Sequence, residues 1–285
     1  MTARVMVQGV TSGAGKSTLT ALLCLYLRQQ GFKVAPFKAL NLSLNSYVTS
    51  EGKEMGIAQA YQAWAAGLEP EACMNPILLK PSDEGRMQMV LNGRPYAEID
   101  PHSKAPDQRI LVDAIKGSFE HLCERFDFIV IEGSGSPVEI NLVGKDLANM
   151  RTAEIARSPV LLVGDIDKGG VFAGLYGTWH LMSGPHRRMM KGFIINRFRG
   201  DGSILGSGIE ILENKMSMPC LGVVPMVELR TPEEDSLGMT GRGPRGSCSD
   251  DMRVVWVDSL QSLLEAAQPG LDLRRICDIG SKGID

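Results

Sequence analysis

The sequence predicts an α/β fold in which helices wind around a mostly parallel sheet, and three observations predict it. Short apolar runs alternate with longer segments of helical periodicity along most of the chain. Several runs are apolar at every position, which is typical of strands buried on both faces. Each of these runs is followed by glycine or polar residues. Ligands of such sheets bind at the carboxyl ends of the strands, so we expect the functional residues at that edge.

The first half of the chain predicts two strands and three helices. We expect strands at 4–8 and 33–37. Apolar residues spaced three and four apart predict a helix at 16–30, and the glycine that follows suits a helix C-terminus. An alanine-rich pattern predicts a helix at 55–66, and a long apolar stripe predicts another at 107–126.

The second half predicts four more strands, each a short apolar run. We expect them at 128–131, 159–163, 192–195 and 221–224. The repeated order of strand, helix and strand favours parallel pairing, because each crossover helix returns the chain to the same edge of the sheet.

The composition changes after residue 237, which separates a main domain, 1–237, from a tail, 238–285. The first nine residues of the tail include four glycines and indicate a flexible linker. Beyond the linker we expect one more strand at 252–257 and a short helix at 258–267. We expect no terminal element at 280–285.

Charge and cysteine content exclude several classes of function. The 285-residue chain has 30 Lys and Arg against 33 Asp and Glu, a formal net charge of −3, so we expect neither nucleic acid nor a membrane surface as a partner. No run approaches the roughly 18 apolar residues of a membrane span, and the N-terminus lacks the apolar core of a signal peptide, so we expect a cytoplasmic protein. The six cysteines form no Cys-x-x-Cys pair and the four histidines form no pair at zinc-site spacing, so we expect reduced, scattered cysteines.

The strongest local signal is Gly9-Val-Thr-Ser-Gly-Ala-Gly-Lys-Ser-Thr18, between a predicted strand and a predicted helix. This context is typical of a P-loop, whose backbone N–H groups hold nucleotide phosphates at a helix N-terminus. We expect Lys16 to neutralise phosphate oxygens and the Ser17 hydroxyl to hold Mg²⁺. Five residues separate Gly9 from Gly15, where the common P-loop has four. The nucleotide-binding residues predicted here are Gly13, Ala14, Gly15, Lys16, Ser17 and Thr18.

Two charged residues come at the ends of predicted strands and face the same edge. Glu132 ends the run 128–131, where a carboxylate can bind Mg²⁺ directly or through water. Lys38 ends the second strand, and an ammonium there suits a transferred phosphoryl group or a substrate carboxylate. Position 11 is threonine, so the extra loop lysine of partition-type ATPases is absent, and no Asn-Lys-x-Asp guanine motif occurs. We therefore expect ATP as the nucleotide and Lys16, Lys38 and Glu132 as catalytic residues.

Longer segments carry a resemblance to a known family. The stretched loop and Lys38 resemble dethiobiotin synthetase and the related amidotransferase synthetases, and further signatures are similar to those of the cobyric acid synthases. These signatures fall within roughly residues 3–237, in family order, at 35–46, 74–81, 131–142, 161–172 and 194–201. The resemblance implies a P-loop NTPase fold of the dethiobiotin-synthetase-like type. It implies ATP- and Mg²⁺-dependent amidation, with ammonia, of the b, d, e and g carboxylates of adenosylcobyrinic acid a,c-diamide, giving adenosylcobyric acid.

The resemblance also implies roles for polar residues on the predicted edge. It implies adenine recognition by Asn196, whose amide both donates and accepts, with Arg197 beside it. It makes loop residues on the same edge candidates for binding the corrin, whose amides and carboxylates need polar partners: Asn41, Asn45, Ser46, Ser134, Asn141 and Asp165.

The tail departs from the family. The family continues into a glutamine amidotransferase domain with a cysteine nucleophile, which we expect to be absent here, and Cys248 lies in the predicted linker without the context of a nucleophile. Ammonia would then come from a separate glutaminase subunit or a lost domain. Two alternatives stay open. One is a sibling ligase, cobyrinic acid a,c-diamide synthase or dethiobiotin synthetase, and the other is a nucleotide- or corrinoid-binding remnant without turnover.

Overall fold

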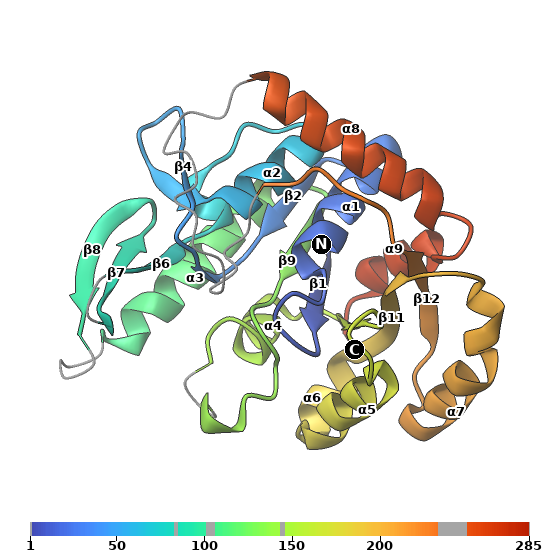
Figure 1. Ribbon diagram of the computed structural model, residues 1–285. Helices are drawn as coiled ribbons and strands as arrows, with labels where there is room; N and C mark the ends of the chain where they lie inside the picture. The colour runs from blue at the N-terminus through green and yellow to red at the C-terminus, as the bar shows by residue number, and fades with distance from the viewer. Residues whose placement is uncertain (1, 83–84, 101–105, 143–145, 233–249, 285) are drawn as a thin grey trace.

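A six-stranded parallel sheet forms the centre of the molecule (Figure 1). The computed structural model describes residues 2–82, 85–100, 106–142, 146–232 and 250–284. All neighbouring strands of this sheet pair in parallel, so the predicted fold class is confirmed. In spatial order the strands are β12 (Cys220–Pro225), β11 (Met190–Phe198), β10 (Val160–Asp165), β1 (Ala3–Gly9), β9 (Phe128–Glu132) and β2 (Val34–Phe37).

Helices cover both faces of this sheet. One face packs against α1 (Lys16–Gln29), α2 (Ile57–Ala65), α8 (Asp250–Ala267) and α9 (Leu273–Lys282). The other packs against α3 (Gln108–Arg125), α4 (Met150–Ala156), α5 (Val171–Leu181), α6 (Gly184–Met189) and α7 (Gly206–Met216). Of the helices in the described segments, none is long and apolar enough to cross a membrane.

The two helical layers explain why the central strands are apolar at every position. Val5 and Val7 of β1 belong to the core on the α1 side, whereas Met6 between them belongs to the core on the α3 side. All three side chains are fully buried. Successive side chains of a strand point to opposite faces, so a strand between two helical layers requires apolar residues on both.

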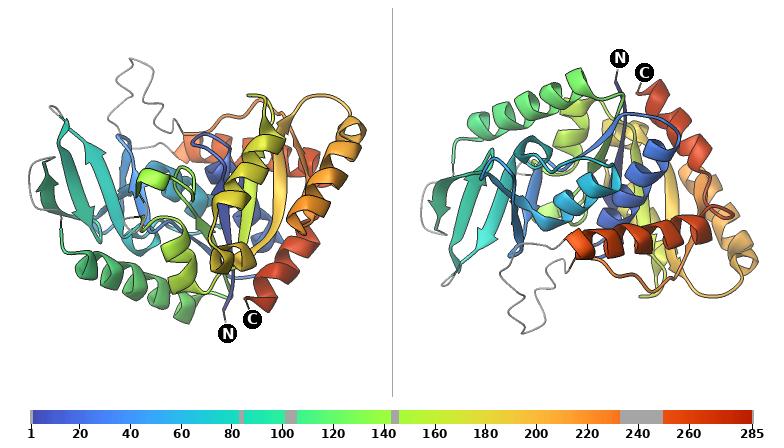
Figure 2. Two further views of the ribbon diagram at one scale, coloured as in Figure 1. Left: turned by 90° about the horizontal axis from the view of Figure 1, so that it is seen from below. Right: turned by 90° about the horizontal axis from the view of Figure 1, so that it is seen from above.

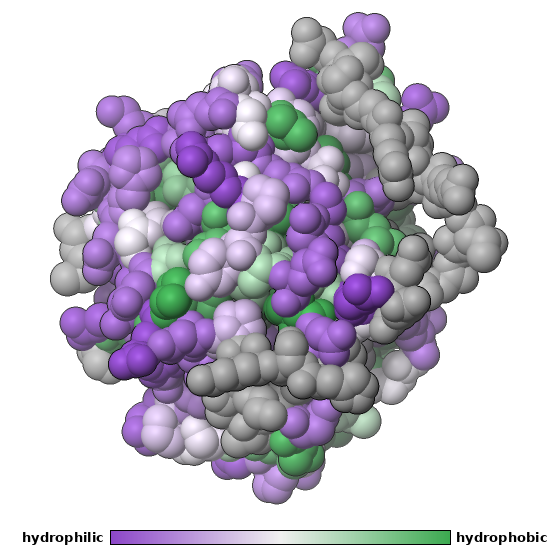
Figure 3. Space-filling model, turned by 90° about the vertical axis from the view of Figure 1, so that its left-hand side faces the viewer, coloured by the Kyte–Doolittle hydropathy of each residue, from purple (hydrophilic) through white to green (hydrophobic). Residues whose placement is uncertain are grey.

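Two small sheets, which the sequence analysis did not predict, lie between residues 40 and 99. One has four strands, β3 (Leu40–Leu42), β6 (Ile77–Pro81), β7 (Met87–Leu91) and β8 (Arg94–Ile99). The other pairs β4 (Ser46–Val48) with β5 (Glu54–Gly56), which explains why α2 begins at Ile57 and not at residue 55. Figure 2 shows β6, β7 and β8 at one end of the molecule and α7 at the other. The face over the four-stranded sheet is mainly hydrophilic, with scattered hydrophobic residues (Figure 3).

The tail folds onto the main sheet as two helices. The predicted strand at 252–257 is wrong, because these residues lie in α8. Met252, Val254 and Val255 of α8 are exposed. The buried residues of this helix follow a helical spacing: Trp256, Leu260, Leu263, Leu264 and Ala267. Trp256 stacks on Trp64 of α2 with ring centroids 5.8 Å apart. The β-branched pair at 254–255 therefore sits on the outer face of a helix.

The chain also has a terminal element, contrary to expectation. Helix α9 continues to Lys282 and packs against β1 and β12. Gly280 lies against the ring of Phe128 in β9, where a Cβ would come within 2.3 Å of the ring. The predicted linker at 238–246 and Cys248 lie outside the described residues.

Candidate functional site

The loop between β1 and α1 is shaped by glycines that no other residue could replace without strain. Gly13 and Gly15 have φ angles of +71° and +95°, in the left-handed region. A Cβ on Gly15 would lie 2.1 Å from Nδ2 of Asn196, so β11 approaches the loop too closely for a side chain. The loop delivers the chain into α1 at Lys16, and helix N-termini present free N–H groups to anions. The predicted P-loop thus has the geometry for binding phosphate.

Lys16 is held across this loop. Its side chain is 6% exposed, and Nζ donates to the carbonyl oxygens of Thr11 and Gly135, both at 3.0 Å. Gly135 belongs to the loop after β9, so this ammonium ties the two loops at the strand ends together. A cation fixed at that place faces whatever anion the loop N–H groups hold.

Glu132 is the centre of a buried hydrogen-bonded cluster at the end of β9. Its Oε1 accepts from Ser17 Oγ and from Lys38 Nζ, both at 2.7 Å. Its Oε2 accepts from Gln62 Nε2 at 2.6 Å and from Gln59 Nε2 at 3.2 Å. Burial raises the pKa of the Glu132 carboxyl, but the Lys38 charge and the hydrogen bonds from Lys38, Ser17 and Gln62 outweigh it, so this pKa lies below its usual range. Glu132 is therefore a buried anion with four donors.

Two oxygen atoms at the start of α1 fit the coordination of a magnesium ion. A hydroxyl and a carboxylate oxygen, Ser17 Oγ and Glu132 Oε1, lie 2.7 Å apart at the start of α1, and hard oxygen ligands are those that Mg²⁺ prefers. A carboxylate oxygen has two lone pairs, and Oε1 uses both, on Ser17 and Lys38. Lys38 is thus the cation that this oxygen holds in the structure.

A cavity of about 180 Å³, here called the phosphate crevice, opens beside these groups. It brings together ten of the predicted site residues: Gly13, Gly15, Lys16, Ser17, Thr18, Lys38, Asn41, Glu132, Ser134 and Arg197. Asn41 donates from Nδ2 to Gln59 Oε1 at 3.1 Å, so it extends the hydrogen-bonded cluster around Glu132.

A second cavity of about 230 Å³ adjoins the first, because Thr18 and Arg197 line both. Asn196 lines it together with residues beyond β12 and Leu263 of α8. The Asn196 amide donates from Nδ2 to the carbonyl oxygen of Ala14 at 2.9 Å. Asn196 lies within β11 and not after a strand end.

The remaining predicted site residues line neither cavity. Asp165 is 5% exposed and holds Arg197, whose Nη1 donates to Asp165 Oδ2 and to the Gly13 carbonyl oxygen, both at 2.9 Å. Ser46 donates to Glu54, and the Asn45 carbonyl oxygen accepts from the backbone of Ile57. Asn141 is exposed in the short 3₁₀ helix η3 (Ile140–Leu142). Ala14 is fully buried within the loop.

The sequence analysis missed three residues that organise the site. Gln59 and Gln62 are fully buried in α2, and a polar pair three positions apart in an alanine-rich helix was the available signal. The side chain of Asn149 forms two hydrogen bonds to the loop after β9. Its Oδ1 accepts from Ser134 N at 2.9 Å, and its Nδ2 donates to Ser134 O at 2.7 Å. It lies 15 residues along the chain from Ser134, so only the fold reveals this contact.

A family model and curated relatives match most of this chain. A family model described as the CobQ/CobB/MinD/ParA nucleotide binding domain matches residues 5–237. The chain is 52% identical over 237 residues to a protein named cobyric acid synthase from Clostridium botulinum (strain ATCC 19397 / Type A), covering 82% of this chain and 47% of the relative. A protein of the same name from Clostridium acetobutylicum is 50% identical over 232 residues, covering 81% and 47%.

The chain thus spans about half the length of the curated relatives it matches. Among solved structures, the septum site-determining protein MinD from Pyrococcus horikoshii, complexed with Mg-ADP, matches 99% of this chain and 96% of its own. Its TM-score of 0.45 and identity of 14% are too low to support an argument. From the family model and the sequence identities, the chain belongs to the CobQ/CobB/MinD/ParA nucleotide-binding domain family, and its resemblance to the cobyric acid synthases is confirmed.

Proposed function

We propose that this chain is the synthetase part of a cobyric acid synthase. It would use Mg-ATP to activate the b, d, e and g carboxylates of adenosylcobyrinic acid a,c-diamide as acyl phosphates, which ammonia converts to the amides of adenosylcobyric acid. The observation that carries the proposal is the buried cluster of Ser17, Lys38 and Glu132 at the mouth of a P-loop. The similarity to proteins named cobyric acid synthase supports the choice of substrate.

The reaction follows from the poor reactivity of a carboxylate towards an amine. A substrate carboxylate oxygen forms a bond to the γ-phosphorus of ATP while the bond to ADP breaks, in line. Ammonia then attacks the acyl carbon, phosphate leaves, and the extra proton of the nitrogen passes to solvent. Neither step needs a nucleophile from the protein. The work of the protein is to align the two anions and to stabilise the charge on the transferring group.

Lys16 and Lys38 supply that stabilisation from two sides of the crevice. Lys16 is fixed by two carbonyl oxygens, so its charge is already in place when the nucleotide binds. Ser17 and Glu132 would hold the magnesium ion, which neutralises phosphate charge when bound. Lys38 donates to Oε1 of Glu132, and both residues line the phosphate crevice, so the ammonium is placed to meet the phosphoryl group and the substrate carboxylate.

Gln59 and Gln62 act in this scheme as positioning residues. Both donate to Oε2 of Glu132, the oxygen away from Lys38. Their two hydrogen bonds keep the carboxylate charged and oriented. Gln62 also donates to the Ser17 carbonyl oxygen at 3.4 Å, so one side chain aligns both proposed ligands of the metal.

We propose that adenine occupies the cavity beside the phosphate crevice. Asn196 and Arg197 line it, and Met226 and Leu263 add apolar surface for a base. Without an acidic residue of the guanine motif, this cavity should prefer ATP to GTP. Equal affinities of the two nucleotides in a calorimetric titration would refute this assignment.

The corrin would approach from the loop after β9. Asn41 and Ser134 line the crevice and are therefore the candidates for binding a reacting carboxylate. The segment Pro137–Ile140 lines a cavity of about 590 Å³ together with residues of α3, α4 and α6, which is space for a large ligand. Arg151 also lines it and carries a guanidinium of the kind that binds carboxylates. Asn45, Ser46 and Asn141 remain outer candidates, and Asp165 would act through Arg197.

Trapping the acyl phosphate tests this function. Incubation of the chain with Mg-ATP, adenosylcobyrinic acid a,c-diamide and hydroxylamine should give hydroxamates of the corrinoid, detectable by mass spectrometry. Hydroxamates formed only from cobyrinic acid, or only from the dethiobiotin precursor, would assign a sibling ligase. Nucleotide binding without hydroxamate on any of these carboxylates would assign a remnant without turnover.

A further inference from the structure

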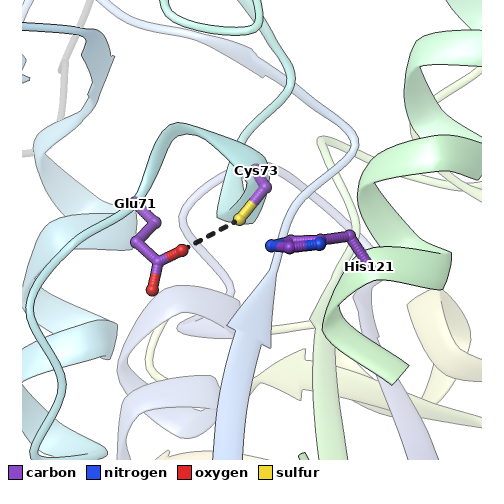
Figure 4. A group of neighbouring side chains, drawn as sticks. All are labelled: Glu71, Cys73 and His121. Carbon is purple, nitrogen blue, oxygen red and sulfur yellow. Dashed lines mark hydrogen bonds between the residues drawn. The ribbon is translucent and has the colours of Figure 1, made fainter. Parts of the chain in front are cut away.

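A second group of ligand-type side chains lies away from the phosphate crevice, on the side of α3. Glu71 and Cys73 come at the 3₁₀ helix η1 (Ala72–Met74), and His121 comes from α3 (Figure 4). One ligand atom of each lies within 4.8 Å of the other two. Cys73 Sγ is already 3.6 Å from Glu71 Oε2, and the hydrogen bond between them is drawn in Figure 4.

Two of these three side chains, Glu71 and His121, contact a positive charge. Arg125, one turn beyond His121 on α3, donates from its two terminal nitrogens to the two carboxylate oxygens of Glu71, each at 2.6 Å. Arg125 Nη1 is also 2.9 Å from His121 Nε2. A guanidinium only donates, so Nε2 is the acceptor in this contact. The lone pairs of Glu71 and His121 therefore converge on one cation.

We propose that Glu71, Cys73 and His121 bind a divalent transition-metal ion of the zinc class, in exchange for the Arg125 guanidinium. Carboxylate oxygen, thiolate sulfur and imidazole nitrogen form a ligand set that zinc accepts. Tetrahedral bonds to such ligands place the donor atoms about 3.5 Å apart, which the Cys73–Glu71 pair already matches. The other separations, at most 4.8 Å, close by rotation of surface side chains. Three protein ligands leave the fourth position to water.

The thiol enters this site with its proton. Cys73 Sγ donates to Glu71 Oε2, so the metal-free group is a thiol. Metal binding forms the sulfur–metal bond and releases that proton to solvent. The exchange places a divalent cation on the same carboxylate and imidazole that hold the Arg125 guanidinium.

The site lies directly behind the segment that carries Lys38. The carbonyl oxygen of Met74, at the end of η1, accepts from Lys38 N at 2.8 Å. Asn75 Nδ2 donates to the Lys38 carbonyl oxygen at 3.0 Å. A metal that fixes Glu71 and Cys73 would therefore help to fix the backbone of Lys38, whose side chain lines the phosphate crevice.

Cobalt(II) is the probe for a test that needs no activity. Titration of the purified chain with Co²⁺ should give a thiolate-to-cobalt charge-transfer band and visible d–d bands of a four-coordinate ion, and Zn²⁺ should remove both. Cys73→Ser should abolish the charge-transfer band, and His121→Ala should abolish tight binding. Cys123→Ser, which changes another half-buried cysteine two residues after His121, is the matched control and should keep the spectrum. No band, or a band that survives Cys73→Ser, would overturn the proposal.

The exchange with Arg125 has its own readout. Arg125→Met should raise the affinity for Co²⁺ about fivefold, the worth of one competing ion pair. Arg109→Met, on the same helix and paired with Asp107, should leave the affinity unchanged. An Arg125→Met affinity equal to or lower than that of the parent chain would show that Arg125 does not compete for the ligands.

Discussion

At the scale of single residues, the account depends most on the ion pair between Glu132 and Lys38. The two side chains are 1% and 9% exposed, and Nζ lies 2.7 Å from Oε1. A buried pair contributes little to stability relative to an apolar pair, but removing one partner leaves an unpaired buried charge. Buried charges of this kind cluster at functional sites, and here both line the crevice beside a phosphate-binding loop.

Glu132→Gln should destabilise the fold as well as stop the reaction. Loss of the carboxylate leaves Lys38 buried without its counter-ion, which costs about 3–5 kcal/mol of unfolding free energy at neutral pH. The folded pKa of Glu132 lies below the reference value of 4.5, so this contribution is complete above pH 4.5 and is lost as the pH falls through the folded pKa. The difference in unfolding free energy between parent and variant should therefore shrink in acid, as measured by urea denaturation at several pH values.

The same variant tests the role in holding metal. Excess Mg²⁺ should restore part of the lost amidation in Glu132→Gln, since the amide oxygen is a weaker ligand and not an absent one. Glu124→Gln, a change at an exposed position on α3, is the control and should alter neither stability nor rate. Near-parental amidation by Glu132→Gln would refute the assignment of this residue.

Lys16→Ala should reduce the rate of ATP-dependent amidation by about 10³-fold or more, because it removes a fixed cation from the transferring phosphoryl group. Lys116→Ala removes an exposed lysine of α3 and should keep the parental rate. The initial rates of amidation of the two variants can be compared by mass spectrometry of the corrinoid. A Lys16→Ala rate close to that of the control would show that the loop does not serve phosphoryl transfer.

At the scale of elements, helix α9 approaches the sheet so closely that a substitution at their contact tests how tightly the two pack. A Cβ on Gly280 would meet the buried Phe128 ring at 2.3 Å and the Arg4 carbonyl oxygen at 3.2 Å, so Gly280→Ala should lower stability by about 1–3 kcal/mol. Gly117→Ala in α3 meets nothing within 4 Å and should raise stability by about 0.5–1 kcal/mol, since alanine favours the helix. Thermal denaturation of the two variants should give shifts of opposite sign. A stable Gly280→Ala variant would mean that α9 does not pack tightly on the sheet.

Some of these helices and strands could be predicted from the sequence and others could not. The six strands of the main sheet were predictable because burial on both faces requires uninterrupted apolar runs. The hairpin of β7 and β8 carried its signal in Asn92-Gly93, whose φ angles of 50° and 79° both lie in the left-handed region that a two-residue turn needs. Helix α8 was read wrongly over 252–257 because β-branched residues on its exposed face outweighed a helical spacing that begins at Trp256.

The residues of the candidate site also fall into those that the sequence could predict and those that it could not. Lys16, Ser17, Lys38 and Glu132 were found because each stands next to the end of a strand or in a glycine-rich loop, and the topology brings those ends together. The contacts of Asn149 depend on how the loop after β9 packs, which no local pattern encodes, whereas Gln62 left a signal in the polar pair of α2. The spacing of cysteines and histidines did not predict the group of Glu71, Cys73 and His121, because His121 comes from a separate helix.

At the scale of the whole molecule, the source of nitrogen is the property to test in a chain that spans about half the length of its curated relatives. An acyl phosphate is attacked by free ammonia, so we expect the isolated chain to use ammonium salts and to ignore glutamine. The rate should rise with pH towards the ammonium pKa of roughly 9, because only NH₃ is nucleophilic. Glutamine-dependent amidation by the pure chain, free of contaminating ammonia, would contradict this expectation. Glutamine use that appears only with an added glutaminase subunit would identify the partner that delivers ammonia.

The central claim is that this chain converts corrinoid carboxylates to amides at the expense of ATP. The measurement that tests it most directly is mass spectrometry of adenosylcobyrinic acid a,c-diamide after incubation with the chain, Mg-ATP and an ammonium salt. The account predicts products lighter by one mass unit for each amide formed, ending at the fourth amide, with one ATP consumed for each. A corrinoid of unchanged mass, with ATP intact or hydrolysed without amide formation, would contradict it.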